Sequence, residues 1–494
     1  MLLRAMQRIP VTRTGIRLLP EPRRVISKPF LPGGEVNGGS RVHRILSRIL
    51  DLSEPVVAST LAATLERFSA RHADVMSVLD GSFAAVAHHV EFPALLSVER
   101  RRLIGAYFTH EYSIEAAALS NPSMVPAPSQ HGVPPGACRF IMSLRAIGEG
   151  HLSSIQFRSG VIDARGGISV DPVTPFAKTA QHRPPVYEKS IFQMKLDELD
   201  SLTATAARVL DSLPDRFTID LLEAAIRVVD DAPGGDQGAQ QATRTIHWLA
   251  SSNYDSTFAA DSSISERVIF PAGPSESQGM EDARFVRFTR DDGSITYFAT
   301  YTAFDGYRIL PQLIETQDFV SFRMSTLNGR AAVNKGIALF PRKIDGCFVA
   351  LARLDNENNH LIRSENVRFW HESDTLQTPE TPWELTQLGN CGSPLETEAG
   401  WLVITHGVGP FRQYVLGAML LDLHDPARIV GCLREPLLSP NDDERDGYVP
   451  NVVYSCGSMI SGNRLVLPYG YSDVGSRIAT VQLEDLLSEL TRHE

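Results

Sequence analysis

Cysteine is scarce in this sequence and is never clustered. Five cysteines are spread over 494 residues, and no two of them follow the C-x-x-C spacing: Cys138, Cys347, Cys391, Cys432 and Cys456. This distribution excludes a disulfide framework and gives no cysteine-based zinc site. A reducing, cytoplasmic location is therefore expected. We also expect no metal and no resident cofactor.

Positive charge is in short supply as well. The chain has 47 Lys and Arg against 58 Asp and Glu, which gives a net charge of −11. A general nucleic-acid binder needs a basic excess to neutralise phosphates, so we expect no nucleic-acid partner. The balance still permits a small basic pocket for one small anion.

A long apolar run is missing too. No segment approaches the ~20 apolar residues that cross a bilayer, and Met1–Arg24 has no apolar core of signal-peptide length, so we expect no membrane association. Hydrophobic residues make up 43% and charged residues 21%, which is typical of a globular protein. No motif recurs at a fixed period, so the sequence alone does not predict a repeat architecture.

The N-terminal part, residues 1–120, reads as a proline-rich arm followed by a helical extension. Apolar residues recur at helical spacing from Val42 to Leu50, and a further helix is expected over Phe92–Ala118. Helices of this kind must bury an apolar face against the main body or against another subunit. The second option predicts a homo-oligomer formed through these helices.

Residues 121–494 read mostly as short strands separated by Gly, Asn, Asp and Pro clusters. This pattern predicts a sandwich, a barrel or a propeller. A helical pattern interrupts it over about residues 189–232, which indicates a helical insertion, and strands are expected again from Arg244 onward.

One charged stretch, Gly279–Phe285, stands at the head of a predicted hairpin. The β-rich runs Phe285–Phe288 and Ile295–Phe304 flank the turn sequence Asp291-Asp292-Gly293. Taken alone, the stretch is more typical of a solvated loop. Its charged residues are Glu281, Asp282 and Arg284.

Polar residues mark other strand ends in a similar way. Taken singly, His406 lies in an apolar run and is more typical of a structural histidine. Lys335 and Arg353 are, taken singly, more typical of surface or ion-pair groups. The segments concerned are Asn121-Pro122-Ser123, Ser143-Leu144-Arg145, Asn334-Lys335-Gly336, Thr405-His406-Gly407 and Tyr469–Asp473.

Taken in order, these motifs resemble glycoside hydrolase family 130, the β-mannoside phosphorylases and related β-mannosidases of carbohydrate metabolism. The resemblance runs from about Asn121 to the C-terminus. It implies an all-β dominated fold, a five-bladed β-propeller with its active site at the central channel, here with an N-terminal helical extension and a helical insertion. It is strongest in Gly279–Phe285, Ala338–Ile344, Gly400–Gly407, Gly417–Pro426 and Val449–Gly457.

The resemblance also implies a reaction. Asp282 matches the family's catalytic aspartate, which delivers a proton through a sugar hydroxyl while inorganic phosphate attacks the anomeric carbon with inversion, so the partners are an oligosaccharide and phosphate. The matching phosphate-binding residues are Arg145, Lys335 and His406. The matching substrate-binding residues are Asn121, Ser123, Glu281, Arg284 and Asp473, and Arg284 also orients Asp282.

Two departures from the family pattern leave alternatives open. Ala283 replaces a proline, and Lys335 stands where many phosphorylases have arginine, although lysine binds phosphate as a point charge and not as a fork. Without a phosphate site the enzyme would be an inverting β-mannosidase whose two carboxyl groups lie ~6.5–9.5 Å apart. Candidate bases are Glu276, Glu281 and Glu149. The third hypothesis is a catalytically silent carbohydrate-binding propeller. It predicts that the polar residues do not converge on one pocket.

Overall fold

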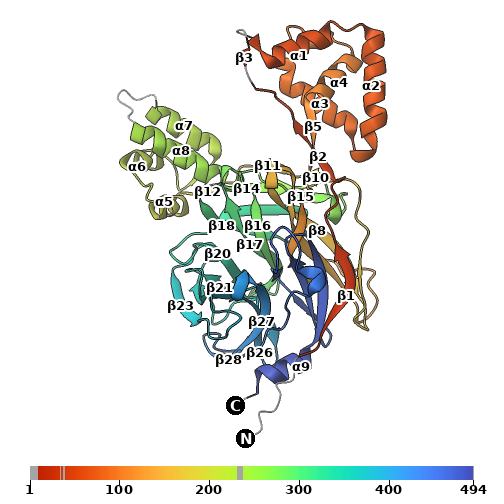
Figure 1. Ribbon diagram of the computed structural model, residues 1–494. Coiled ribbons are helices and arrows are strands. Elements are labelled where there is room, and N and C mark those ends of the chain that lie inside the picture. Colours follow the sequence, from red (N-terminus) through yellow and green to blue (C-terminus); the bar gives the residue numbers. More distant parts are fainter. Residues whose placement is uncertain (1–8, 34, 37–38, 231–236, 493–494) are drawn as a thin grey trace.

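The computed structural model describes residues 9–33, 35–36, 39–230 and 237–492 (Figure 1). Most of this part is β-sheet, and two groups of helices stand at one end of the sheets. Among the described residues, five sheets have four to six strands each. No helix in these ranges combines the length and the apolar character needed to cross a membrane.

The five sheets follow one another along the chain, apart from a few exchanged edge strands. The first contains β6 (Ala118–Pro126), β7 (Cys138–Ile147), β8 (Ser153–Ile162), β9 (Ile168–Val170), β10 (Lys178–Thr179) and β15 (Arg267–Ile269). The second contains β11 (Gln181–Arg183), β14 (Tyr254–Thr257), β16 (Met280–Thr289), β17 (Ile295–Phe304), β18 (Ile309–Thr316) and β19 (Ser321–Thr326).

The remaining sheets complete the body. The third contains β20 (Lys335–Leu339), β21 (Phe348–Arg353), β22 (Asn359–Ser364) and β23 (Glu372–Gln377). The fourth contains β24 (Gln387–Asn390), β25 (Leu395–Thr397), β26 (Gly400–Val408), β27 (Tyr414–Leu421) and β28 (Ile429–Cys432). The fifth contains β29 (Val453–Tyr454), β30 (Met459–Ser461), β31 (Arg464–Tyr471), β32 (Gly475–Gln482) and β1 (Val11–Leu18).

Contacts between these sheets close a ring. β6 of the first sheet contacts β16 of the second, β16 contacts β20 of the third, and β20 contacts β24 of the fourth. β27 of the fourth sheet then contacts β29 of the fifth, and β31 of the fifth returns to β6. The ends of the chain help to close the ring, because Val11 in β1 pairs with Val481 in β32.

The predicted hairpin is confirmed. β16 and β17 pair in antiparallel register from Phe285 opposite Ala299 to Thr289 opposite Ile295. Gly293 takes a φ of 81° in the turn, a left-handed conformation that glycine adopts without strain. Near the start of β16 the pairing skips a residue between Glu281 and Arg284, which is a β-bulge.

The helical N-terminal part has a core of its own, in which Leu46, Leu79 and Leu103 are buried. The helix expected over Phe92–Ala118 is shorter, because α4 ends at Tyr107 and the next residues pair with β2 as a strand. Self-association through these helices stays a prediction. The elements are β2 (Val25–Pro29), β3 (Glu35–Val36), β4 (Gly39–Ser40), α1 (Arg41–Leu50), α2 (Glu54–Phe68), α3 (Val75–Val86), α4 (Val98–Tyr107) and β5 (Thr109–Ser113).

The second helical group interrupts the sheets and is longer than the sequence pattern indicated. The segment from Arg244 to Ser251, where strands were expected to resume, belongs to a helix that buries Ile246 and Leu249 against the other helices of the group. The elements are β12 (Tyr187–Glu188), α5 (Lys189–Glu198), α6 (Ala204–Asp211), β13 (Arg216–Phe217), α7 (Ile219–Asp230) and α8 (Gln237–Ser251). A last helix, α9 (Leu483–Leu490), follows β32.

Candidate active site

The polar strand ends of three neighbouring sheets share one backbone feature. Asn121, Asp282 and Asn334 have left-handed φ values of 51°, 56° and 61°. Asn121 and Asp282 lie within the bulges of β6 and β16, whereas Asn334 precedes β20, whose bulge lies between Lys335 and Ala338. Non-glycine residues adopt this conformation at a cost and are found in it mainly where function or packing requires them. The bulges of β6 and β16 therefore bring the side chains of Asn121 and Asp282 together.

Asp282 lies among cations and amide donors. The Asn121 side-chain amide donates a hydrogen bond to the Asp282 carboxylate. Burial raises the pKa of this carboxyl, but the charges of Arg284, Arg145 and Lys335 outweigh burial and hold the pKa below its ordinary value. With these contacts Asp282 is ionised at neutral pH.

The neighbouring Glu281 bridges two cations that come from different sheets. Arg145 in β7 donates from Nη2 to Glu281 Oε1 at 2.9 Å, and Lys335 in β20 donates from Nζ to Oε2 at 2.6 Å. The Glu281 side chain is only 14% exposed, so water screens these pairs weakly. Two of the cations expected to bind phosphate are thus brought together beside Asp282.

Arg284 ties this cluster to the fourth and fifth sheets. Its side chain is fully enclosed, donates from Nε to the Cys391 carbonyl at 3.0 Å, and donates from Nη2 to the Tyr454 hydroxyl at 2.8 Å. A third bond runs from Nη1 to the main-chain carbonyl of Asp282 at 3.0 Å. Arg284 therefore holds the bulge, and with it the direction of the Asp282 side chain.

His406, expected to bind phosphate together with Arg145 and Lys335, lies in the interior beside Arg353. It is 1% exposed, and its Nε2 lies 3.2 Å from Arg353 Nη1. Burial, followed by the charges of Arg353 and Arg284, holds the His406 pKa well below its ordinary value. His406 is therefore neutral at neutral pH, and its Nε2 accepts the hydrogen bond from Arg353.

Arg353 was interpreted from the sequence as a surface or ion-pair group and was not assigned to the site. It is half-buried, its Nε has no hydrogen-bond partner, and it forms no ion pair with a carboxylate in the described part of the chain. It lies directly opposite Lys335 in the β20–β21 pairing. Aligning β20 with β21 as an antiparallel pair, with Lys335 opposite Arg353, would have placed these two cations together.

Ser123 and Asp473 were both expected to contact the sugar. Ser123 is fully buried, and its hydroxyl accepts a hydrogen bond from the Phe285 amide at 3.0 Å, so it supports β16 from behind the cluster. Asp473 has a left-handed φ of 50° and is half-buried. Burial raises its pKa, and the nearby carboxylates of Asp282 and Glu281 add to the rise despite Arg145.

The three candidate bases differ in burial and in their contacts. Glu276 is fully buried and accepts hydrogen bonds from the hydroxyls of Tyr254 and Tyr301 and from two backbone amides, so it is closed off from a water nucleophile. Glu149 is exposed on the β7–β8 loop. Glu281 is the candidate that contacts the cations beside Asp282. No group of three or more His, Cys, Asp and Glu side chains among the described residues is arranged to hold a metal ion.

Most enzymes that cleave glycosidic bonds use a pair of carboxyl groups, and Asp282 and Glu281 are such a pair of neighbours, here set among cations. Residues 244–492 match the model of glycoside hydrolase family 130, described as beta-1,4-mannooligosaccharide phosphorylase. The 1,2-beta-oligomannan phosphorylase of Thermoanaerobacter sp. (strain X514) is 32% identical over 218 residues, which are 43% of this chain and 71% of that protein.

Two further comparisons involve Listeria innocua. Its beta-1,2-mannobiose phosphorylase is 29% identical over 229 residues, 45% of this chain and 63% of the relative. The solved structure of a beta-1,2-mannobiose phosphorylase from the same organism aligns with 77% of this chain and 93% of its own, at 20% identity and a TM-score of 0.43. The chain belongs to glycoside hydrolase family 130, and it is an enzyme of this family of β-mannoside phosphorylases and glycosidases. The family resemblance read from the motifs is confirmed.

The low pKa of Asp282 predicts a pH-dependent contribution to stability. Its folded pKa lies below the unfolded value of ~3.9, so the ionised carboxylate stabilises the fold above that value, and the contribution is lost as the pH falls through the folded pKa. Asp282→Asn should therefore lower the free energy of unfolding at pH 7, and the loss should shrink on acidification.

Urea unfolding of both proteins at several pH values measures this difference. Asp291→Asn, in the exposed turn of the same hairpin, is the matched control. A deficit in Asp282→Asn that does not change with pH would contradict the electrostatic origin.

Proposed function

We propose that this chain is a five-bladed β-propeller enzyme that cleaves β-mannosides with inorganic phosphate, with inversion, and releases mannose 1-phosphate. The observation that carries the proposal is the convergence of Arg145 and Lys335 on one carboxylate directly beside Asp282. The ring of contacts between five sheets, whose strand pairs are antiparallel except for β10 with β15, supports the propeller. The phosphorylase relatives support the reaction class.

Phosphate would bind by competing with Glu281 for the cations. A phosphate ion carries more charge and more acceptor oxygens than a carboxylate, and charge-assisted hydrogen bonds to Arg and Lys are its usual contacts. Arg353 adds a guanidinium that has no carboxylate partner in the described part of the chain. We assign Arg145, Lys335 and Arg353 as phosphate ligands and His406 as a positioning residue that fixes Arg353.

Phosphate binding would also prepare the acid. The charges of Arg145 and Lys335 help to keep the Asp282 pKa low, and an anion bound to them offsets that effect, so the pKa rises and Asp282 takes up a proton. A phosphate oxygen then forms a bond to the anomeric carbon while the glycosidic bond breaks. The Asp282 proton passes through a sugar hydroxyl to the departing oxygen.

The same end of the sheets would hold the mannosyl unit. Asn121 contacts Asp282, and the Asp473 side chain makes no hydrogen bond within the described residues, which leaves its carboxyl group to a sugar hydroxyl. Ser123 contributes by holding β16 in place.

Hydrolysis is the second candidate, and one observation favours it. Glu281 supplies a second carboxylate next to Asp282, and inverting hydrolysis needs a second carboxylate as the base for water. A silent binding propeller is disfavoured, because its polar residues would not converge on one cluster as Arg145, Glu281 and Lys335 do.

The products distinguish phosphorolysis from hydrolysis. Incubation with β-1,2- and β-1,4-mannobiose should give mannose 1-phosphate only when inorganic phosphate is present, measured by ³¹P NMR. Asp282→Asn should lower the rate by about 10²–10⁴-fold, the usual contribution of a general acid. Free mannose released at the same rate without phosphate would convert the assignment to a hydrolase.

Arg353 provides a test of the phosphate site. Arg353→Ala should raise the KM for phosphate by about 10–100-fold, because a charge-assisted hydrogen bond contributes about 1.5–3 kcal/mol. The KM for the mannoside should change little. Lys343→Ala, which removes a cation paired with the exposed Asp291, is the control and should leave both constants unchanged. An unchanged phosphate KM in Arg353→Ala would remove this residue from the site.

A further inference from the structure

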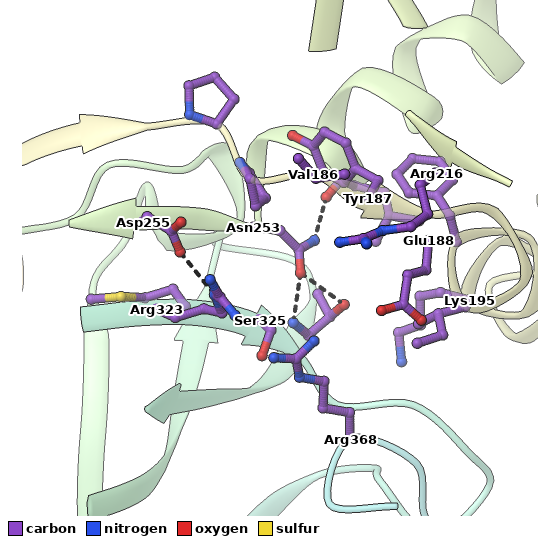
Figure 2. Close-up of a pocket in the computed structure, with 17 residues that line it drawn as sticks. Val186, Tyr187, Glu188, Lys195, Arg216, Asn253, Asp255, Arg323, Ser325 and Arg368 are labelled. Atoms are coloured by element: carbon purple, nitrogen blue, oxygen red, sulfur yellow. Dashed lines mark hydrogen bonds and ion pairs between the residues drawn. The ribbon is translucent and has the colours of Figure 1, made fainter. Parts of the chain in front are cut away.

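A cleft of about 320 Å³ lies between the helical insertion and the second sheet (Figure 2). One wall comes from β12, α5 and β13, and the other from β14 and β19. Arg368, from the connection between β22 and β23, completes the lining. None of the residues assigned to the β-mannoside site lines this cleft.

The side chains that line the cleft include more cations than carboxylates, whereas the whole chain has a net negative charge. The whole chain carries a net charge of −11, yet the cleft is lined by four cations and only two carboxylates. A local excess of one sign in a partly enclosed space attracts the opposite charge. The cations are Lys195, Arg216, Arg323 and Arg368, and the carboxylates are Glu188 and Asp255.

Two of these cations are already occupied. Arg323 pairs with Asp255 at 3.0 Å. Lys195 is buried and donates to the Leu327 carbonyl at 2.8 Å and to Glu198 at 3.1 Å, so it ties α5 to the sheet. The Lys195 bond to Leu327 joins the two walls, and the attraction of an anion is left to the other two cations.

Arg216 and Arg368 are less closely paired with carboxylates than the other two cations. Arg216 is exposed and forms no ion pair within 4 Å in the described part of the chain, although Glu188 is its neighbour across the β12–β13 pairing. The nearest carboxylate oxygen to Arg368, from Glu315, is 3.6 Å away. Figure 2 shows the two arginines entering the cleft from the insertion and from the β22–β23 connection.

The rest of the lining is uncharged and suits the uncharged part of a small ligand. Val186 is 54% exposed and stands with Pro185 and Ile191 as an apolar wall. The side-chain amide of Asn253 is engaged on both sides, by the Thr326 amide and by the Leu249 carbonyl. A ligand here would use the guanidinium groups for one ionised end and the apolar wall for the remainder.

We propose that this cleft is a second, non-catalytic site for a small phosphorylated sugar. Guanidinium groups bind phosphate through paired hydrogen bonds, and the two arginines lie on separate elements, so a phosphate between them would join the insertion to the third sheet. The cleft volume lies at the lower end of the ~300–1,000 Å³ range of small-molecule sites, which suits a ligand of monosaccharide size.

Calorimetry is performed on a protein that lacks two of the three proposed phosphate ligands, Arg145 and Lys335, which weakens anion binding at the β-mannoside site and leaves the cleft unchanged. The Arg145→Ala/Lys335→Ala variant is titrated with mannose 1-phosphate, inorganic phosphate and mannose. Mannose 1-phosphate should bind with a stoichiometry of one, at least tenfold more tightly than inorganic phosphate, and mannose should not bind. Adding Arg216→Ala and Arg368→Ala should weaken binding at least tenfold, whereas Arg227→Ala on the exposed face of α7 should not.

Hydrogen exchange locates the ligand independently of affinity. Mannose 1-phosphate should slow exchange in α5 and β19 of the same variant. Loss of anion binding in Arg145→Ala/Lys335→Ala, equal affinity for inorganic phosphate, or binding insensitive to Arg216 and Arg368 would each overturn the proposal. In a protein with Arg145 and Lys335 intact, the cleft substitutions should reduce the stoichiometry from two to one. A failure of the proposed reaction is seen separately, as the absence of mannose 1-phosphate among the products.

Discussion

The central interaction is the pair of hydrogen bonds that Arg145 and Lys335 donate to the two oxygens of Glu281. It draws three neighbouring sheets to one carboxylate and sets the electrostatic environment of Asp282. Because these groups are poorly exposed, their charges act on each other with little screening. The same attraction that holds the cluster together makes it a strong site for an anion with more oxygens than a carboxylate.

The fold supports this cluster from behind. Arg284 reaches from the second sheet to Cys391 and Tyr454, so the direction of Asp282 depends on contacts with the fourth and fifth sheets. The ring in turn depends on its closure, in which β1 adds to β32 and Arg13 pairs with the buried Glu444. A buried carboxylate is costly without such a partner, so this ion pair favours the closed arrangement.

The hairpin that contains Asp282 could be predicted from the sequence, because its two strands and the Asp-Asp-Gly turn lie within one short segment. The β1–β32 pairing could not be predicted, because no local pattern links Val11 with Val481. The recurring polar residues at strand ends were visible in the sequence, but the contact between Asn121 and Asp282 did not follow from the spacing, since they are 161 positions apart. Arg353 resembled an ordinary surface arginine until the pairing with Lys335 showed which cations face each other.

Replacing Glu281 with glutamine tests the account most directly. Glutamine keeps the size of the side chain but removes the charge that competes with phosphate for Arg145 and Lys335. The account predicts that Glu281→Gln binds inorganic phosphate more tightly, by calorimetry, and still forms mannose 1-phosphate. Unchanged or weaker phosphate binding, together with loss of all turnover, would contradict it and would identify Glu281 as the base of a hydrolase.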